Sequence, residues 1–414
     1  MLTELFPRMH RRYSSLPLLG PVLDEFAMWI VARGYSRLAV RRHLRAARRL
    51  DRRWRRRGHR SLHDVRREDL CVCAPGHSQD DADLAAGAHQ LTAYLEARGL
   101  LPRQTIATPP EVAGYQAYLT ELRGLAPSTI VQHVSTASQL LQYLTGTTPP
   151  VRLSRLTPAA IDGFIEAMSV RLSRASLQHT VAQLRSFLRW LGAQQCVPSG
   201  LHTQIDTPRV YRQERLPRAL AWHTVSALLR SIARTTPLGR RDYAMLVLIA
   251  TYGLRTSEVV ALTLDDILWR RRVLRINRRK VEGALLLPLT DGVGAALLDY
   301  LQHGRPPQPT RLVFLRHRPP AGVLKPTAVT EVFQARVRRS GLAIPFQGPH
   351  CLRHSLAVHL LRQGVSLKAI GDVLGHRSAE STCVYLRLAV EDLRGVALSL
   401  PPYDIDSTAE GGTR

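Results

Sequence analysis

Apolar residues recur at helical spacing in the N-terminal third of the chain, and this pattern is itself repeated. One stripe runs through Val40, Leu44, Ala47, Leu50 and Trp54, and a second runs ninety positions later through Ile130, Val134, Ala137, Leu140 and Leu144. Steps of three and four residues place such side chains on one face of an α-helix. Gly34 and Gly124 precede the two stripes at the same offset. We therefore expect two related helical units, at about 16–100 and 108–203.

The pattern changes after the second unit. Residues 204–216 have no periodicity, mixed charge and a proline, which is typical of a linker between domains. Farther on, alternation at 273–277 and an apolar run at 285–288, on either side of a turn, predict a β-hairpin among helices. Helices are expected around this hairpin at 221–234, 239–253, 326–340, 350–363, 366–374 and 378–386.

These patterns predict a chain that is mainly α with a small inserted β-sheet. The expected divisions are an additional Arg-rich helical domain at 1–107, a helical domain at 108–203, the linker at 204–216, a mixed α/β domain at 217–398 and a mobile tail at 399–414.

The charge indicates the kind of partner. Lysine and arginine number 58 against 32 acidic residues, a net charge of +26, which favours a polyanion such as double-stranded DNA. A membrane partner is not expected, because it usually involves a basic amphipathic helix with bulky aromatic residues. Only Lys280, Lys325 and Lys368 are lysines. Each supplies a titratable amine that arginine cannot.

Twelve arginines lie within residues 37–60, where Asp51 is the only acid. Like charges at this density repel one another unless an anion neutralises them. We expect four of them to contact DNA phosphates: Arg41, Arg45, Arg48 and Arg52. The alternative is a basic face that meets only solvent.

The sequence also indicates a compartment. It has no run of about 18 apolar residues, and Met1–Arg12 is followed by Tyr-Ser-Ser rather than by the apolar core of a secretory signal. The five cysteines are odd in number, and Cys71 and Cys73 have no companion pair for zinc. We expect reduced thiols and a cytoplasmic, nucleoid-associated protein of bacterial type.

Four short sequences in the last domain carry side chains suited to phosphoryl transfer. They are Gly253-Leu254-Arg255-Thr256-Ser257-Glu258, Lys280 at the hairpin tip, His350-Cys351-Leu352-Arg353-His354, and Gly375-His376 with Tyr385 nine residues after the histidine. Arginine forks match phosphate oxygens and stabilise charge on a pentavalent phosphorus. Tyrosine can act as a nucleophile, and lysine and histidine can transfer protons.

Each of these residues taken alone has an ordinary structural interpretation. Tyr385 could be a packing residue, Arg255 a helix cap and Lys280 a solubilising residue of a hairpin. The ordered set favours a site. Carboxylates for a two-metal centre, a Walker loop and a His-Glu-x-x-His motif are all missing from the sequence. What remains is phosphoryl transfer through a covalent tyrosine, with no metal or other cofactor expected.

Residues 205–398 resemble the catalytic domain of the tyrosine recombinase, or phage integrase, family. The resemblance rests on the Gly-Leu-Arg-x-Ser-Glu box, Asp265-Asp266-Ile267, the hairpin, His-x-Leu-Arg-His-Ser, Leu-Gly-His and the final tyrosine. Arg353 precedes His376 by 23 residues, as in the family. Residues 108–203 resemble, more weakly, the family's SAM-like core-binding domain, whereas 1–100 extend beyond the usual two-domain layout.

The resemblance implies a role for each matching residue. Tyr385 attacks the scissile phosphate and forms a 3′-phosphotyrosyl bond, while Arg255 and Arg353 hold the non-bridging oxygens. Lys280 protonates the departing 5′-oxygen, a role that Arg279 fills less well because arginine is a poor general acid. His350 assists proton transfer, and His376 donates a hydrogen bond to the phosphate.

The resemblance also implies an activity and an assembly. The expected activity is site-specific recombination for integration, excision or transposition of a mobile element. A homo-tetramer on DNA is expected, with accessory recombinases or DNA-bending proteins as further partners. The alternatives are a type IB topoisomerase-like or resolvase activity and a catalytically inactive DNA-binding relative; the complete set of six residues argues against the inactive relative.

Overall fold

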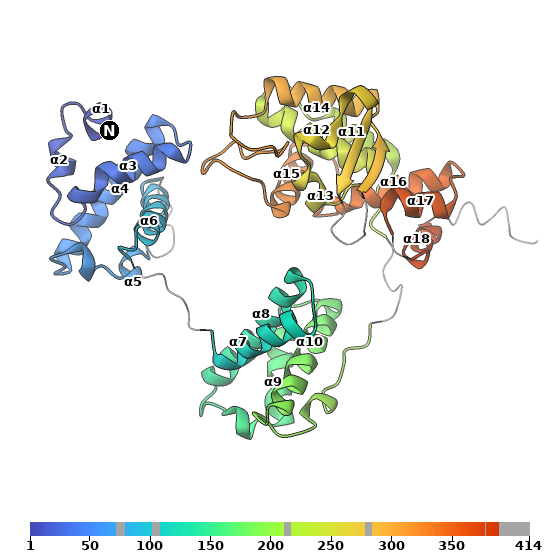
Figure 1. The fold of residues 1–414 in the computed structure, drawn as a ribbon, viewed down its shortest axis with the longest axis horizontal. Helices are drawn as coiled ribbons and strands as arrows, with labels where there is room; N and C mark the ends of the chain where they lie inside the picture. Colours follow the sequence, from blue (N-terminus) through green and yellow to red (C-terminus); the bar gives the residue numbers. More distant parts are fainter. Residues whose placement is uncertain (72–78, 102–107, 211–216, 278–283, 377, 389–414) are drawn as a thin grey trace, which may run out of the picture. The chain divides into compact units, whose positions relative to one another are not determined.

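The computed structural model describes residues 1–71, 79–101, 108–210, 217–277, 284–376 and 378–388 (Figure 1). The chain divides into two compact units. One is Pro102–Glu214, and the other combines Met1–Leu101 with the residues from Arg215 onward. Each part has its own hydrophobic core: one lies within residues 2–101, one within 112–205, and two within 225–385.

The N-terminal part is helical in all its described elements. They are α1 (Leu2–Leu5), α2 (Arg11–Ser14), α3 (Leu23–Ala32), α4 (Arg37–Arg56), α5 (Arg67–Leu70) and α6 (Gln79–Ala97), with 3₁₀ turns at Gly20–Val22 and Leu62–Asp64. The Ser36 hydroxyl caps α4 by accepting the Ala39 amide at 3.3 Å. The apolar stripe of α4 is fully buried, as its spacing predicted. It packs on α6, where Gly87 has no Cβ to clash with the methyl group of Ala46.

Residues 108–210 contain a series of elements similar to that from α3 to α6. They contain α7 (Pro110–Ala117), a π turn (Tyr118–Leu122), α8 (Pro127–Gly146), a 3₁₀ turn (Leu153–Arg155), α9 (Pro158–Ser169), α10 (Arg174–Ala193) and a 3₁₀ turn (Leu201–Thr203). Helices α4 and α8 are both 20 residues long. Gly34 and Gly124 precede them with φ of 81° and 55°, a conformation that glycine adopts without strain.

The C-terminal part is a helical assembly with one small sheet. Its helices are α11 (Trp222–Arg230), α12 (Pro237–Tyr252), α13 (Thr256–Ala261), α14 (Asp291–His303), α15 (Pro326–Ser340), α16 (His350–Arg362), α17 (Leu367–Leu374) and α18 (Glu380–Cys383). Short 3₁₀ turns lie at Leu264–Asp266, Trp269–Arg271 and Val384–Leu388. The sheet has the order β1 (Ile267–Leu268), β2 (Val273–Asn277) and β3 (Ala284–Pro288), and both pairings are antiparallel.

The expected hairpin is β2 and β3, with Leu274 opposite Leu287. Strand β1 and helix α14 are among the elements that were not predicted. Strand β1 is only two residues long, too short for an alternating pattern. Helix α14 has a regular apolar stripe, but Gly292 and Gly294 in its first turn weaken the helical signal.

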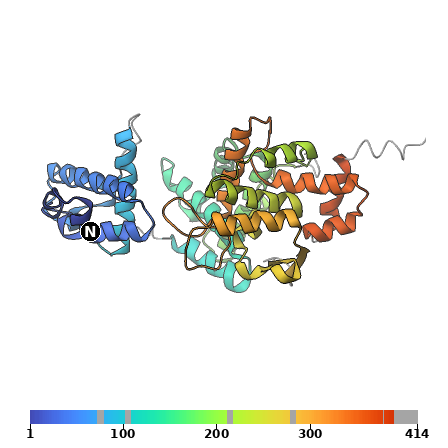
Figure 2. The same ribbon diagram turned by 90° about the horizontal axis from the view of Figure 1, so that it is seen from above.

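Helix α12 runs through the core of the C-terminal part and is buried along nearly all of its length (Figures 1 and 2). It packs against α14 and α16. A helix that is buried on most of its faces is the usual centre of a larger domain. It ends at Gly253, whose φ of 63° turns the chain directly into α13. This turn brings Arg255 to the site described next.

Candidate active site

Arg255 lies at the start of α13 and is held there by Glu258. Its backbone N–H donates to Glu258 Oε2 at 2.8 Å, and its Nη1 donates to Oε1 of the same carboxylate at 2.8 Å. Its Nη2 donates to the carbonyl oxygen of Gly375 at 3.2 Å. The Arg255 side chain is 41% exposed and that of Glu258 only 7%. A buried carboxylate therefore fixes a guanidinium that a ligand can still reach.

Arg353 lies in the first turn of α16 and is only 2% exposed. Its guanidinium donates to the carbonyl oxygens of Gly253 and Leu374. Arg255 and Arg353, 98 positions apart in the chain, thus bind the adjacent carbonyls of Gly375 and Leu374 at the end of α17. Two arginine forks meeting at one turn make a strongly cationic corner, suited to an oxyanion.

Tyr385 lies in the 3₁₀ turn that follows α18 and is 2% exposed. Its hydroxyl is 3.0 Å from His354 Nδ1, and its ring stacks on His376 with centroids 6.1 Å apart. Burial raises the pKa of Tyr385, while the charges of Arg353 and Arg255 oppose that rise. The phenol is therefore protonated at neutral pH and needs an acceptor for its proton before it can attack.

The histidines of the site are oriented by one another and by a threonine. The rings of His350 and His354, one turn apart on α16, meet edge to face with centroids 4.6 Å apart. His376 Nδ1 is 2.8 Å from the hydroxyl of Thr382, which is itself buried. Desolvation, followed by the charges of Arg353 and Arg255, lowers the pKa of His350. Desolvation is also the main cause that lowers the pKa of His354, to about 4. Both rings are neutral at pH 7 and can accept hydrogen bonds.

These contacts bring together five of the six predicted catalytic residues: Arg255, His350, Arg353, His376 and Tyr385. The sixth, Lys280, lies outside the described residues, between β2 and β3. Its role stays a prediction.

Three further residues of the site were not assigned from the sequence: Glu258, His354 and Thr382. Glu258 follows Arg255 by three residues, and His354 follows His350 by four, so helical spacing alone places each pair on one face. His359, farther along α16, stacks on Trp222 with centroids 4.2 Å apart. In the described parts of the chain no three side chains of the metal-ligating types are grouped so that they could hold a metal ion.

The arginines of α4 form a second cationic feature. Asp51 faces inward and accepts the backbone amides of Leu18 and Leu19 at 3.1 and 2.8 Å, so it is engaged away from the arginines. An exposed row one helical turn apart lines two adjoining hollows of the surface: Arg42, Arg45, Arg49, Arg52 and Arg56. One of these hollows has a volume of about 220 Å³.

The four arginines predicted to bind DNA do not all lie on this row. Arg45 and Arg52 are exposed on it. Arg41 Nε donates to the carbonyl oxygen of Leu5 at 2.8 Å, and Arg48 lies 5.8 Å from the ring centroid of Tyr13. The guanidinium groups of Arg41 and Arg48 are thus partly engaged within their own domain.

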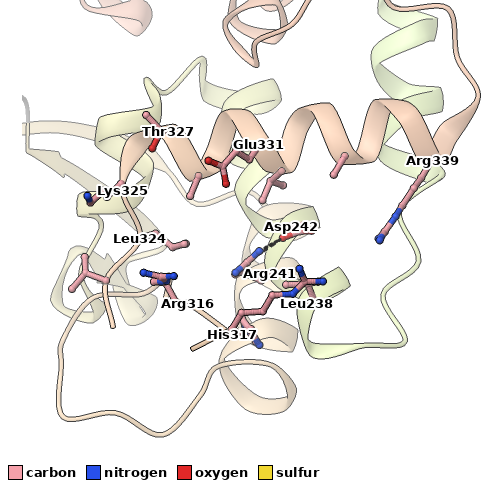
Figure 3. A pocket seen from close by; sticks show the side chains of 15 residues that line it. Leu238, Arg241, Asp242, Arg316, His317, Leu324, Lys325, Thr327, Glu331 and Arg339 are labelled. Carbon is pink, nitrogen blue, oxygen red and sulfur yellow. Dashed lines mark hydrogen bonds and ion pairs between the residues drawn. The ribbon is translucent and has the colours of Figure 1, made fainter. Parts of the chain in front are cut away.

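A hollow of about 490 Å³ lies between α15 and the first turns of α12 (Figure 3). Arg241 and Asp242 form an ion pair there at 2.7 Å, and Arg336 donates to the second oxygen of Asp242 at 2.6 Å. All three side chains are nearly buried. Arg241 and Gly253 are twelve residues apart on one helix, about 18 Å, so this hollow is separate from the site around Tyr385.

None of the described helices is long and apolar enough to cross a bilayer.

Known protein families match both parts of the chain that resemble recombinases. The profile of the Phage integrase family matches residues 219–392, and that of the Phage integrase N-terminal SAM-like domain matches 112–195.

Individual proteins agree with these profiles. A putative integrase/recombinase, y4rA of Sinorhizobium fredii, is 33% identical over 94% of this chain and 96% of its own length. The tyrosine recombinase XerD of Lacticaseibacillus casei is 29% identical over 69% of this chain and 96% of its own. A crystal structure of a lambda integrase dimer bound to a COC′ core site has the same fold, with a TM-score of 0.53 and 16% identity over 78% of this chain and 91% of that one. The chain belongs to the tyrosine recombinase, or phage integrase, family of site-specific DNA recombinases.

Proposed function

We propose that the chain cuts and rejoins double-stranded DNA through a covalent bond between Tyr385 and a 3′-phosphate. The observation that carries this proposal is the meeting of Arg255 and Arg353 on the adjacent carbonyls of Gly375 and Leu374, next to His376, whose ring stacks on Tyr385. Residues scattered over 131 positions of sequence thereby surround one nucleophile.

Each residue has a part in the proposed reaction. The Tyr385 oxygen attacks phosphorus, the bond to the 5′-oxygen breaks, and a phosphotyrosine and a free 5′-hydroxyl result. Arg255 and Arg353 stabilise the charge on the non-bridging oxygens. His350 takes part in proton transfer, His376 donates a hydrogen bond to the phosphate, and Lys280 gives the proton to the departing oxygen. Attack by a second 5′-hydroxyl reverses these steps on a new strand, and no net bond energy is lost.

The N-terminal part has a separate role in this proposal. Its α4 arginines bind DNA phosphates, and the inward orientation of Asp51 supports this role because the acid does not neutralise them. The similar series of elements from α3 to α6 and from α7 to α10 supports two related DNA-binding modules N-terminal in sequence to a catalytic domain.

The biological setting follows from the reaction. Joining two duplexes needs four strand cuts, and we propose a homo-tetramer on DNA that integrates, excises or transposes a mobile element, with accessory recombinases or DNA-bending proteins. A chromosomal substrate places the enzyme at the nucleoid in a bacterial cytoplasm. A type IB topoisomerase-like or resolvase activity uses the same chemistry. A topoisomerase rejoins each cut strand to the end from which it was cleaved and so leaves no exchanged strands.

A nicked suicide duplex tests the chemistry. Its sequence is one that the protein selects from a random pool, and the nick lets the cleaved end diffuse away so that the covalent intermediate accumulates. The wild-type chain should give an adduct that resists SDS, whereas Tyr385→Phe should bind the duplex and form none. An adduct with Tyr385→Phe would remove the tyrosine from the proposal. Strand exchange between two labelled duplexes then distinguishes recombination from relaxation alone.

A further inference from the structure

His354 lies between the proposed nucleophile and the proton-transfer histidine. Its Nδ1 is 3.0 Å from the Tyr385 hydroxyl, and its ring meets that of His350 edge to face. His376 also stacks on Tyr385, so four rings are linked by pairwise contacts with centroid distances of 4.6, 5.6 and 6.1 Å. The role described above for His350 does not account for this contact at Tyr385.

The ring and the hydroxyl of Tyr385 are held by different groups. The ring belongs to a small apolar cluster that includes Leu356, Ile370 and Leu374. The cluster holds the ring in its pocket and makes no hydrogen bond with the hydroxyl. The rotation and proton direction of that hydroxyl depend on a polar partner, and His354 Nδ1 is at hydrogen-bond distance.

His354 is not suited to act as a general base that removes the proton of Tyr385. Burial lowers the pKa of His354 to about 4 and raises the pKa of Tyr385. Both shifts disfavour transfer of the phenol proton to the imidazole. The neutral ring can accept a hydrogen bond from the phenol without taking its proton.

We propose that His354 is a positioning residue for strand cleavage, whose Nδ1 accepts the Tyr385 O–H and fixes the direction from which the oxygen attacks the phosphate. This proposal rests on Tyr385 being the nucleophile. Orientation of a reacting oxygen affects the rate of the chemical step and leaves DNA affinity unchanged, because the phosphate is bound by other residues.

Two substitutions distinguish the contribution of the Nδ1 acceptor of His354 from that of its aromatic ring. His354→Phe keeps an aromatic ring against His350 and Tyr385 but has no acceptor. His354→Asn has a side-chain amide at about the place of Nδ1. In single-turnover cleavage of the suicide duplex, His354→Phe should lower the rate about tenfold or more, and its dissociation constant should stay within about twofold of wild type. His354→Asn should restore the rate to within about threefold of wild type.

A spectroscopic measurement reports the contact without using activity. With 3-fluorotyrosine in place of Tyr385, the ¹⁹F resonance of the free protein reports on the hydroxyl's surroundings. It should shift when His354 is replaced by Phe and return toward its original position with Asn. If His354→Phe does not fold, as judged by thermal unfolding, His354→Gly with added imidazole replaces it, and imidazole should raise the cleavage rate.

The outcomes distinguish the two proposals. A wild-type rate in His354→Phe, or a rate in His354→Gly that imidazole leaves unchanged, overturns the positioning role while Tyr385 remains the nucleophile. If the wild-type chain forms no adduct on any selected duplex, the proposed function fails and the positioning role fails with it; the ¹⁹F experiment then decides only whether His354 contacts the Tyr385 hydroxyl. An unchanged resonance in His354→Phe then overturns the contact itself.

Discussion

The carbonyl oxygen of Gly253 accepts a hydrogen bond from the guanidinium of Arg353, one hundred residues farther along the chain. Gly253 can lie this close to Arg353 and Leu374 because it has no side chain. A Cβ there would lie 2.5 Å from Leu374 Cδ2 and 3.4 Å from Arg353 Cγ. The left-handed turn that ends α12 therefore also sets the position of the buried arginine of the site.

Replacement of Gly253 by alanine should lower the rate of cleavage by more than its effect on folding stability explains. The new methyl group displaces Leu374 and with it the carbonyl that Arg353 binds, and misplacement of a group in the site by a fraction of an ångström is costly to catalysis. We expect adduct formation on the suicide duplex to fall at least about tenfold.

Gly341→Ala is the matched control for that change. Gly341 also ends a helix with a positive φ, 67°, but nothing lies within 4 Å of its missing Cβ. It should lose stability through backbone strain of about 1–2 kcal/mol and cleave DNA normally. Equal loss of cleavage in the two variants would assign the Gly253 effect to strain alone.

Arg255→Lys should lose most of its activity although it keeps its charge. The guanidinium of Arg255 binds Glu258 and the Gly375 carbonyl with different nitrogens, and one ammonium cannot reproduce that fork. The cleavage rate should fall at least about a hundredfold. Arg311→Lys, at an exposed arginine paired with Asp265, is the control and should cleave normally. A normal rate in Arg255→Lys would leave Arg255 with a purely structural role.

Lys280→Ala should be rescued by a better leaving group. A 5′-phosphorothiolate departs without needing a proton, so it should restore cleavage by Lys280→Ala far more than cleavage by Arg353→Lys, in which the clamp on the phosphate is damaged. The ratio of rates on sulfur and oxygen substrates is the measurement. Equal ratios for the two variants would transfer the acid role to Arg279 or His350.

Most of the fold could be predicted from the sequence because the patterns that indicate helices and hairpins are local. Twenty-residue stripes such as that of α4 predict a helix from spacing alone, and the β2–β3 hairpin follows from two short runs that flank a turn. Strand β1 depends instead on pairing with β2, which no local pattern reveals. The two glycines in the first turn of α14 weakened its helical pattern in the sequence, and this helix is buried because it packs on α12.

The site was predictable in its residue types and not in its contacts. The motifs named Arg255, Arg353 and Tyr385, but hydrogen bonds between segments a hundred or more residues apart arise only from tertiary packing. The same limit applies to α4, where charge alone did not distinguish Arg41, bonded to Leu5, from Arg45 on the exposed row.

Removing the carboxylate of Asp242 should strongly destabilise the C-terminal part. Arg241 binds it in a nearly buried place (Figure 3), and so does Arg336. Asp242→Asn therefore leaves two guanidinium groups with one neutral partner. Breaking a buried ion pair of this kind costs about 3–5 kcal/mol. Urea denaturation of the full chain measures the loss. Asp265→Asn, at the exposed pair with Arg311, should change little, and equal effects would contradict the structural role of the Asp242 network.

The exposed arginine row of α4 should determine how strongly DNA binding depends on salt. Each phosphate contact adds about 0.9 to the slope of log affinity against log salt concentration on duplex DNA. Replacing Arg42, Arg45, Arg52 and Arg56 with glutamine should therefore flatten that slope by up to ~3–4 units. Preference for a selected duplex over random DNA should change less, because phosphate contacts position a protein without reading bases.

Arg67 and Arg98 provide the control for this experiment, because each already pairs with an acid of its own domain, Glu96 and Glu25. Their replacement by glutamine should leave the slope nearly unchanged. If the four-residue variant also keeps the wild-type slope, the row meets solvent or another protomer. The first hundred residues would then act in assembly, and DNA binding would rest on residues 108–210 and the catalytic part alone.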